Sequence, residues 1–141
     1  MISNIRISKF DSSIRIFAFD LYICDYSMDC LFCKIGAGEI PSDTVFEDAE
    51  VKIFKDIHPK APVHLLVIPK QHIESIAHLE ADHHDIAAKL IFVAKDVAAK
   101  LGLKGYKLIF NVGREGGQDI DHLHLHLRGG WSNADTRDSN I

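Results

Sequence analysis

The stretch GGQDIDHLHLHLRGG, residues 116–130, alternates three histidines with three leucines. Successive side chains of a β-strand point to opposite faces, so the pattern predicts His122, His124 and His126 on one face and the leucines on the other. Such a strand offers one face to an apolar core and one face of imidazoles. The stretch therefore predicts both a place in a sheet and a candidate chemical site.

Three interpretations of the imidazole row stay open. Two of the rings can ligate a metal ion together with His64, whereas the outer pair, about 13 Å apart in an extended strand, cannot easily share one ion. A neutral imidazole held in one tautomer can instead attack phosphorus, and His124, the middle ring, is then the nucleophile. A strand with a solvated polar face is the third interpretation, which three histidines in register disfavour.

A glycine-rich segment before the strand favours the second interpretation. In NVGREGGQ, residues 111–118, glycines expose backbone N–H groups that can cradle an anion. Asn111 and Gln118 add amide donors beside them. We therefore predict an anion site next to His124.

The rest of the chain predicts an α+β fold built on an antiparallel sheet. A helical spacing recurs in Ile86, Leu90, Val93, Val97 and Leu101, which predicts one long helix over residues 81–103. The predicted strands are 44–48, 51–57, 63–69, 105–113 and 119–130.

The composition is that of a single globular domain, with 141 residues, 47% of them hydrophobic and 26% charged. A net charge of −4 argues against a nucleic-acid partner, and no apolar run reaches the roughly 20 residues of a membrane span. A cytoplasmic location is the default expectation. We expect the domain at residues 28–131, a polar tail at 132–141, and at 1–27 an appended arm or a segment upstream of the true start.

The three cysteines, Cys24, Cys30 and Cys33, do not suggest a disulfide scaffold, because their number is odd and low. Cys30 and Cys33 form a C-x-x-C pair. Such a pair is a metal half-site, a redox pair or two reduced thiols, and the sequence leaves the three interpretations open.

These motifs, in this order, resemble the histidine-triad (HIT) nucleotide-binding proteins, whose signature is His-φ-His-φ-His-φ-φ with φ apolar. More narrowly, the chain looks like the Hint branch, the nucleoside phosphoramidase type. The resemblance runs from about residue 29 to 131 and includes CLFCKI, EIPSDTVFED, FKDIHPKAPVHLLVIPKQHI, NVGREGGQ and HLHLHLRGG. It implies a five-stranded antiparallel sheet with one long and one short helix, and a homodimer paired through helices and last strands.

The resemblance also implies an activity, the hydrolysis of purine nucleoside phosphoramidates. An AMP–amine would give AMP and amine through a covalent nucleotidyl-histidine, with no cofactor required for catalysis. The implied partner is a purine nucleotide: AMP, GMP, or an aminoacyl or amine conjugate. The alternatives are a purine-nucleotide binding module with little turnover, and a related dinucleotide or nucleotidyl hydrolase.

Carried over to this sequence, the resemblance makes His124 the nucleophile and gives His122 an orienting role. It implies that the phosphate is held by His64, His126, Asn111, Gly117 and Gln118. Asp56 is implied to accept the ribose hydroxyls, a role that suits a carboxylate. The apolar slot for the base is implied to consist of Leu31, Phe32, Ile40, Phe54 and Ile57.

Three positions depart from the family pattern. Asp119 stands where many relatives have a serine close to the scissile bond. A protonated Asp119 can donate to the leaving amine, whereas an ionised one repels the phosphate. Arg128 replaces the last apolar residue of the signature and either points to solvent or adds positive potential to the site. Asp121 replaces the aromatic or apolar residue usual before the first histidine.

The C-x-x-C pair has a counterpart in some bacterial relatives, which bind a structural zinc through two cysteines and two histidines. The matching residues here are Cys30, Cys33, His72 and His122. Two cysteines and two histidines are an ordinary tetrahedral zinc set. Under this reading His122 is a ligand and not a free proton carrier.

Overall fold

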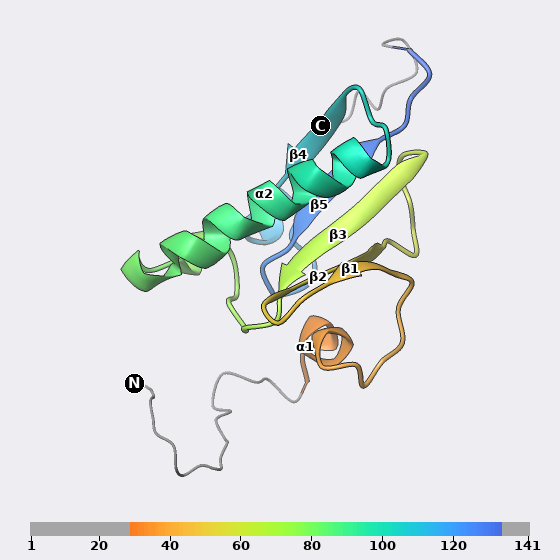
Figure 1. Cartoon of the computed structure of the whole chain (residues 1–141). Helices are drawn as coiled ribbons and strands as arrows, with labels where there is room; N and C mark the ends of the chain where they lie inside the picture. The colour runs from red at the N-terminus through yellow and green to blue at the C-terminus, as the bar shows by residue number, and fades with distance from the viewer. Residues whose placement is uncertain (1–28, 134–141) are drawn as a thin grey trace.

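The computed structural model describes residues 29–133 (Figure 1). The main elements are α1 (Leu31–Gly36), β1 (Thr44–Glu47), β2 (Val51–Lys55), β3 (Val63–Pro69), α2 (His84–Lys100), β4 (Tyr106–Ile109) and β5 (Leu125–Gly129). Three 3₁₀ turns join them, η1 (Ile76–His78), η2 (Ala81–His83) and η3 (Arg114–Gly116). No helix within the described range is long and apolar enough to cross a bilayer. The arm predicted for 1–27 and residues 134–141 of the predicted tail lie outside the described residues.

The strands form one antiparallel sheet in the order β1-β2-β3-β5-β4. This confirms the predicted fold class, with five strands, one long helix and a short helix. The last strand, β5, lies inside the sheet between β3 and β4, so the free edges belong to β1 and β4. A dimer that extends this sheet therefore cannot use β5 as its pairing edge.

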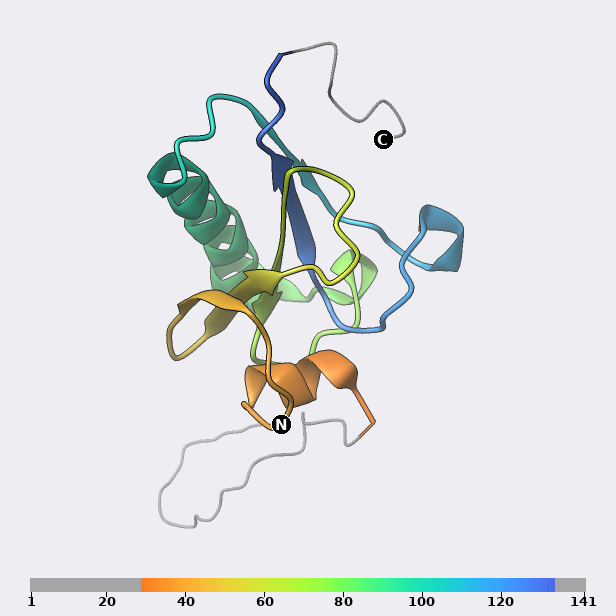
Figure 2. The ribbon, with the colours of Figure 1, turned by 90° about the vertical axis from the view of Figure 1, so that its right-hand side faces the viewer.

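One face of the sheet is apolar and lies under α2 (Figures 1 and 2). The side chains of β2, β3 and β5 alternate between the two faces, as predicted for the histidine–leucine stretch, and every second one joins the core with α2. Leu65 of β3 stands opposite Leu127 of β5, and Leu90 of α2 packs in the same cluster without exposure. The other members of this core are Val51, Ile53, Val67, Ile73, Ala94, Val97, Ala98, Leu123 and Leu125.

The opposite face carries the short helix α1 at one end. Phe32 and Ile35 of α1 pack on Phe54 of β2 and on Leu66 and Ile68 of β3. The ammonium of Lys52, which is buried, donates to the carbonyl of Ile35 at 2.9 Å. Because α1 covers only this end, the rest of the face stays open.

Two predicted elements are shorter in the structure. The strand predicted over 119–130 begins only at Leu125, because the N–H of His122 donates back to Ile120 and that of Leu123 donates to Ile73. These bonds replace the ladder of a regular strand. The strand predicted over 105–113 is likewise limited to Tyr106–Ile109.

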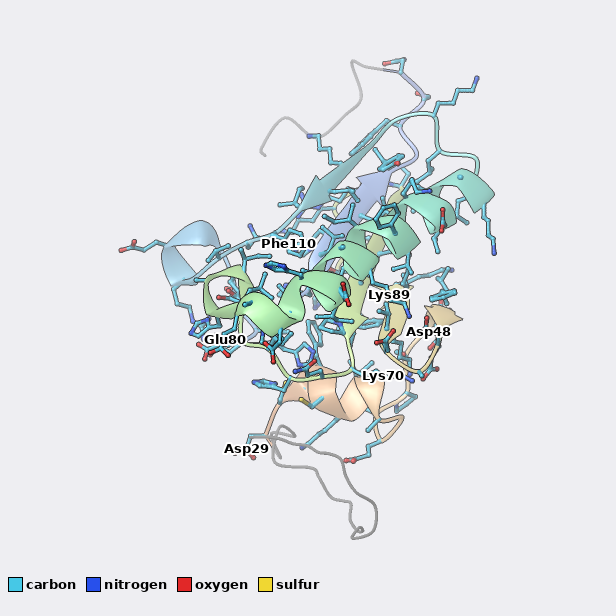
Figure 3. All side chains as sticks on the ribbon, turned by 60° about the vertical axis from the view of Figure 1, so that its left-hand side comes forward. Asp29, Asp48, Lys70, Glu80, Lys89 and Phe110 are labelled. Carbon is cyan, nitrogen blue, oxygen red and sulfur yellow. The ribbon has the colours of Figure 1, made fainter. Side chains whose placement is uncertain are left out.

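An ion pair joins the β1–β2 turn to α2. One carboxylate oxygen of Asp48 accepts the N–H groups of Glu50 and Val51, both at 2.8 Å, and the other pairs with Lys89 at 2.8 Å (Figure 3). The hydrogen bond from Lys89, aided by those from the turn, lowers the pKa of Asp48 to about 2 from an ordinary 3.8.

We expect Asp48→Asn to lower the free energy of unfolding by about 1 kcal/mol at pH 7, since the pair is partly exposed. A carboxyl whose pKa is depressed by folding stabilises the protein above its unfolded pKa. The difference between variant and wild type should therefore shrink as the pH falls from about 4 to about 2. Urea unfolding across this range measures it. Asp96→Asn, which breaks an exposed pair with the adjacent Lys95, is the control and should change little.

Candidate active site

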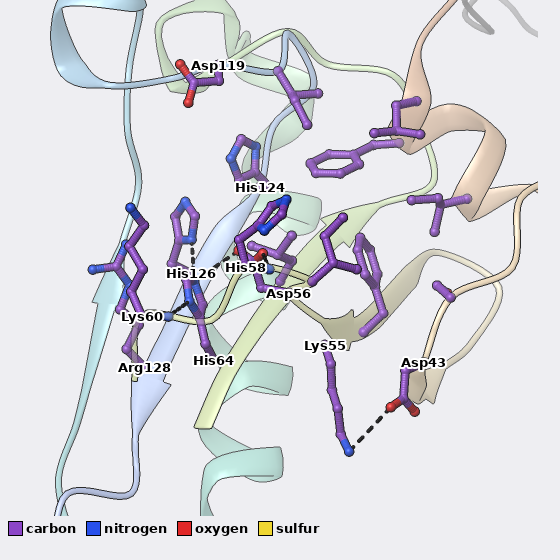
Figure 4. Close-up of a pocket in the computed structure, with 18 of the residues that line it drawn as sticks. Asp43, Lys55, Asp56, His58, Lys60, His64, Asp119, His124, His126 and Arg128 are labelled. Carbon is purple, nitrogen blue, oxygen red and sulfur yellow. Dashed lines mark hydrogen bonds and ion pairs between the residues drawn. The ribbon is translucent and has the colours of Figure 1, made fainter. Parts of the chain in front are cut away.

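The open face of the sheet contains a cleft of about 930 Å³ (Figure 4). Its wall comes from α1 and β2 on one side, and its floor from β3 and β5. Most of the predicted site residues line it: Leu31, Phe32, Phe54, Asp56, Ile57, His64, Asn111, Gly117, Asp119, His124 and His126. Ile40, Gln118 and His122 do not; Ile40 packs beside α1 with the second core cluster.

His124 has its tautomer fixed by the backbone. Its Nδ1 lies 2.7 Å from the carbonyl oxygen of His122, and a carbonyl only accepts, so Nδ1 carries the proton. The lone pair is then on Nε2. Burial lowers the pKa of His124, which keeps the ring neutral at physiological pH. The middle histidine is therefore a neutral imidazole with one free basic nitrogen.

His64 and His126 form a hydrogen-bonded pair beside it. The N–H of Lys60 donates to Nδ1 of His64 at 3.0 Å, so the proton of a neutral His64 is on Nε2. That nitrogen lies 2.9 Å from Nδ1 of His126 and 3.3 Å from a carboxylate oxygen of Asp56. If His64 donates to His126, the proton of His126 is on Nε2, where it is a donor for an anion.

Asp56, the carboxylate at the end of this row of hydrogen-bonded side chains, is also held in place. Asp56 accepts the N–H of His58 at 2.8 Å, while its second oxygen faces His64. Burial lowers the pKa of His64 and brings that of His126 to about 4, where the neighbouring His124 and His64 also contribute. Asp56, His64 and His126 lie close enough to hold a metal ion, but hydrogen bonds already account for their contacts.

The glycine-rich segment folds differently from the prediction. The N–H of Gly113 donates to the side-chain oxygen of Gln118, and those of Gly116, Gly117 and Gln118 donate to carbonyls of the same loop. The predicted cradle of backbone donors is therefore wrong for these four groups. Asn111, which lines the cleft, donates to the carbonyl of Gly116 at 2.8 Å and helps close the loop.

Gln118 is a support of this loop and not a wall of the cleft. Its amide nitrogen donates to the carbonyls of Glu74 and Ile120, at 2.8 and 3.0 Å, and its oxygen accepts from Gly113. The side chain is 2% exposed. Its predicted contact with phosphate is therefore not available in this arrangement.

A second cluster lies outside the cleft, between α1 and the first histidine of the row. Sγ of Cys33 lies 3.2 Å from Nδ1 of His72, and Sγ of Cys30 lies 3.4 Å from Nδ1 of His122. Nε2 of His122 lies 2.8 Å from the carbonyl of Pro69 and so carries the proton, which leaves the Nδ1 lone pair facing the sulfurs. The four ligand atoms lie within 4.8 Å of one another.

This cluster fits a tetrahedral zinc ion. With Zn–S of about 2.3 Å and Zn–N of about 2.0 Å, tetrahedral angles place sulfur and nitrogen about 3.5 Å apart. The sulfur–nitrogen distances here, 3.2, 3.4 and 3.5 Å, are close to that value. The sequence thus predicted the correct four residues as neighbours.

The three departures from the family pattern lie in different places. Asp119 lines the cleft and lies beside His124 (Figure 4). Arg128 is 8% exposed and lines the cleft, so it does not point to solvent. Asp121 is outside the cleft and forms a two-pronged pair with Arg114, at 2.8 and 3.0 Å.

Sequence reasoning missed two kinds of site group. The group that orients His124 is the main-chain carbonyl of His122, and no residue type signals a carbonyl. Lys55, His58 and Lys60 also line the cleft. Lys55 is the last residue of β2, and His58 and Lys60 lie in the loop between β2 and β3, so their nearness to two strand ends at the site was an available signal.

Three comparisons with known proteins agree with this geometry. A family model described as "Scavenger mRNA decapping enzyme C-term binding" matches residues 29–139. Protein HitA of Neisseria gonorrhoeae is 47% identical over 102 residues, 72% of this chain and 95% of that protein. The purine nucleoside phosphoramidase of Escherichia coli K12 is 42% identical over 104 residues, 72% of this chain and 87% of that one.

Solved structures give the same result. The crystal structure of a HIT family hydrolase from Legionella pneumophila has a TM-score of 0.72 at 50% identity and covers 73% of this chain and 94% of that one. A histidine-triad protein from Clostridium difficile has a TM-score of 0.73 at 41% identity, over 76% and 95% of the two chains.

Proposed function

The chain belongs to the histidine-triad family, whose relatives here include hydrolases, and on that premise we propose that it hydrolyses purine nucleoside 5′-phosphoramidates. The observation that carries the proposal is the hydrogen bond from Nδ1 of His124 to the carbonyl of His122. It presents Nε2 of a neutral imidazole as the basic nitrogen of a ring on the cleft floor. The relative named as a phosphoramidase supports the substrate class.

The reaction takes two displacements at phosphorus. Nε2 of His124 attacks the α-phosphorus, the P–N bond breaks, and the amine leaves with a proton. Water then cleaves the nucleotidyl-histidine to release the nucleotide. When His64 donates to Nδ1 of His126, the Nε2–H of His126 is a donor for the charge that develops on the phosphoryl oxygens. A protonated Asp119 supplies the proton of the amine, whereas an ionised one slows the first step.

The nucleoside occupies the other end of the cleft. Phe32 and Phe54, whose ring centroids are 5.6 Å apart, offer an aromatic wall for a purine. Phe32 also lies 5.2 Å from the ring of His124, so base and phosphate sites adjoin. Asp56 is the carboxylate within reach of ribose hydroxyls between them.

The test is a mixture of the full chain with AMP–lysine, followed by chromatography. We expect AMP and lysine to appear in equal amounts. Micromolar AMP binding by calorimetry without any release of AMP from the conjugate would instead favour the second candidate, a nucleotide-binding module. Asp119, which places a carboxylate beside His124, is the feature that favours that candidate.

We propose that the cluster of Cys30, Cys33, His72 and His122 binds a structural zinc ion. Bound there, zinc would tie α1 to the segment before β5 and supply no chemistry to the cleft. His122 would then bind zinc through its side chain and would orient His124 through its main-chain carbonyl. The catalytic proposal requires no cofactor.

We also propose that the protein is a homodimer formed through β4 and α2. β4 is a free sheet edge, and Ile91 and Phe92 of α2 are 48% and 61% exposed, with Leu108 of β4 at 37%. A second copy laid edge to edge would cover all three. Phe92→Glu should shift the sedimenting species from dimer to monomer; an unshifted species contradicts this interface. The cytoplasmic location and the lack of a nucleic-acid partner stay predictions.

A further inference from the structure

Positive charge gathers at the end of the cleft away from the base slot. Arg128 of β5 stands directly opposite His64 of β3 in the strand register and follows His126 by two residues on the same face. Lys60, from the loop before β3, lines the same end. Burial lowers the pKa of His64, the charge of Asp56 raises it, and the charges of Arg128 and Lys60 lower it, so both cations lie near that ring together with Asp56. The hydrolytic steps proposed above use neither side chain.

The two charged ends of the histidine row are distinct. Burial lowers the pKa of both His124 and His126, and the charge of Asp56 raises both, whereas of these two pKa values Asp119 raises only that of His124 and Arg128 lowers only that of His126. Figure 4 shows the same order, with Asp119, His124, His126 and then Arg128 along the cleft. A phosphoryl group over His124 and His126 therefore has a carboxylate at one end and a guanidinium at the other.

The side chain of Arg128 is largely withdrawn from bulk solvent. It is 8% exposed, although it lines an open cleft. Burying a guanidinium is costly, and a planar guanidinium is the side chain best suited to hold a phosphate or carboxylate by paired hydrogen bonds. An exposed lysine beside it, Lys60, adds charge without that geometry.

We propose that Arg128, assisted by Lys60, forms an anion subsite that binds a second negative group attached to the α-phosphoryl, either a further phosphate or a carboxylate on the leaving group. The inference rests on the proposed placement of the nucleotide but not on turnover. With this subsite, the protein prefers nucleotides and conjugates that have a further negative group beyond the α-phosphorus.

The test compares equilibrium binding of AMP and ADP by calorimetry. We expect the wild type to bind ADP about tenfold more tightly than AMP, a gain typical of one charge-assisted contact. Arg128→Leu should remove this advantage while changing AMP affinity less. Arg128→Lys should retain part of it, because charge remains but paired hydrogen bonding does not. Lys60→Met, at an exposed position, should reduce it a fewfold.

Lys55→Met is the matched control. Lys55 carries the same charge and lines the same cleft, but it pairs with Asp43 at 3.4 Å. Its loss should leave the ratio of ADP to AMP affinity unchanged. The subsite is overturned if the ratio of ADP to AMP affinity is unchanged in both Arg128→Leu and Lys60→Met. It is also overturned if Lys55→Met lowers this ratio as much as Arg128→Leu does. Failure to bind AMP at all would instead overturn the proposed function.

A second arm identifies the source of the anion. The value of kcat/KM is compared for adenosine 5′-phosphoramidates of glycine, which has a carboxylate, and of methylamine, which has none. A preference for the glycine conjugate that Arg128→Leu abolishes assigns the subsite to a carboxylate. A preference for ADP over AMP without one for glycine assigns it to phosphate. If the wild type shows neither preference, the proposal is overturned.

Discussion

His124→Ala is expected to lower the release of AMP from AMP–lysine by at least about a thousandfold. The variant lacks Nε2, the nitrogen that would form the bond to phosphorus, and no neighbouring ring replaces it. His126 has its Nδ1 engaged with His64 at 2.9 Å, and His122 is turned away from the cleft toward the cysteines. Single-turnover assays with quenched samples measure the loss.

The control separates a missing nucleophile from a damaged fold. His84→Ala removes an exposed histidine at the start of α2, outside the cleft, and should have wild-type activity. The thermal midpoint of His124→Ala and its affinity for AMP report on the fold and the nucleotide site. Full turnover by a folded His124→Ala would rule out the proposed covalent mechanism.

The second large effect is expected at the cysteine cluster. We expect about one zinc ion per chain in protein expressed with zinc, and none in Cys33→Ser. Loss of the ion should lower the free energy of unfolding by several kcal/mol, on the order expected for a structural zinc site within a fold that has its own core. Metal analysis and thermal unfolding measure both quantities.

Two further observations keep this prediction specific. Cys33 is 3% exposed, so the serine variant alone also buries a hydroxyl, and a chelator added to the wild type must lower the midpoint as well. His78→Ala, which removes a histidine outside the cluster, should retain the ion. Hydrolysis should survive chelation, because the histidines that line the cleft are not among the four ligands. Zinc-free protein with an unshifted midpoint contradicts the site.

Much of the fold could be predicted because burial repeats along the sequence. The alternation at His122–Arg128 correctly separated the leucines under α2 from His124 and His126 in the cleft, even where the chain is not a regular strand. The long helix is correct in its centre, where Leu90 and Val97 are buried. Its ends are not: Ala81–His83 is a 3₁₀ turn, and Leu101 caps the helix at 47% exposure.

The site was predictable as a set of residue types and not as a set of bonds. The zinc candidates come together, and most cleft residues were named in advance. The roles of Gln118 and the loop glycines were not predictable, because a loop's N–H groups can satisfy one another or a ligand with the same sequence. Only the folded loop shows that its N–H groups bond to acceptors of the loop itself.

By itself the sequence determined which side chains share a face, because the two-residue period of an extended chain converts order directly into orientation. It also determined the chemical inventory of the site, which is imidazoles, thiols and carboxylates. The tertiary structure decided which nitrogen carries the proton in His64, His122 and His124, because tautomers follow from hydrogen bonds with main-chain groups, such as that of His122 with Pro69. It decided too that Arg128 lies in the cleft, because only the packed sheet places a strand's end beside His64.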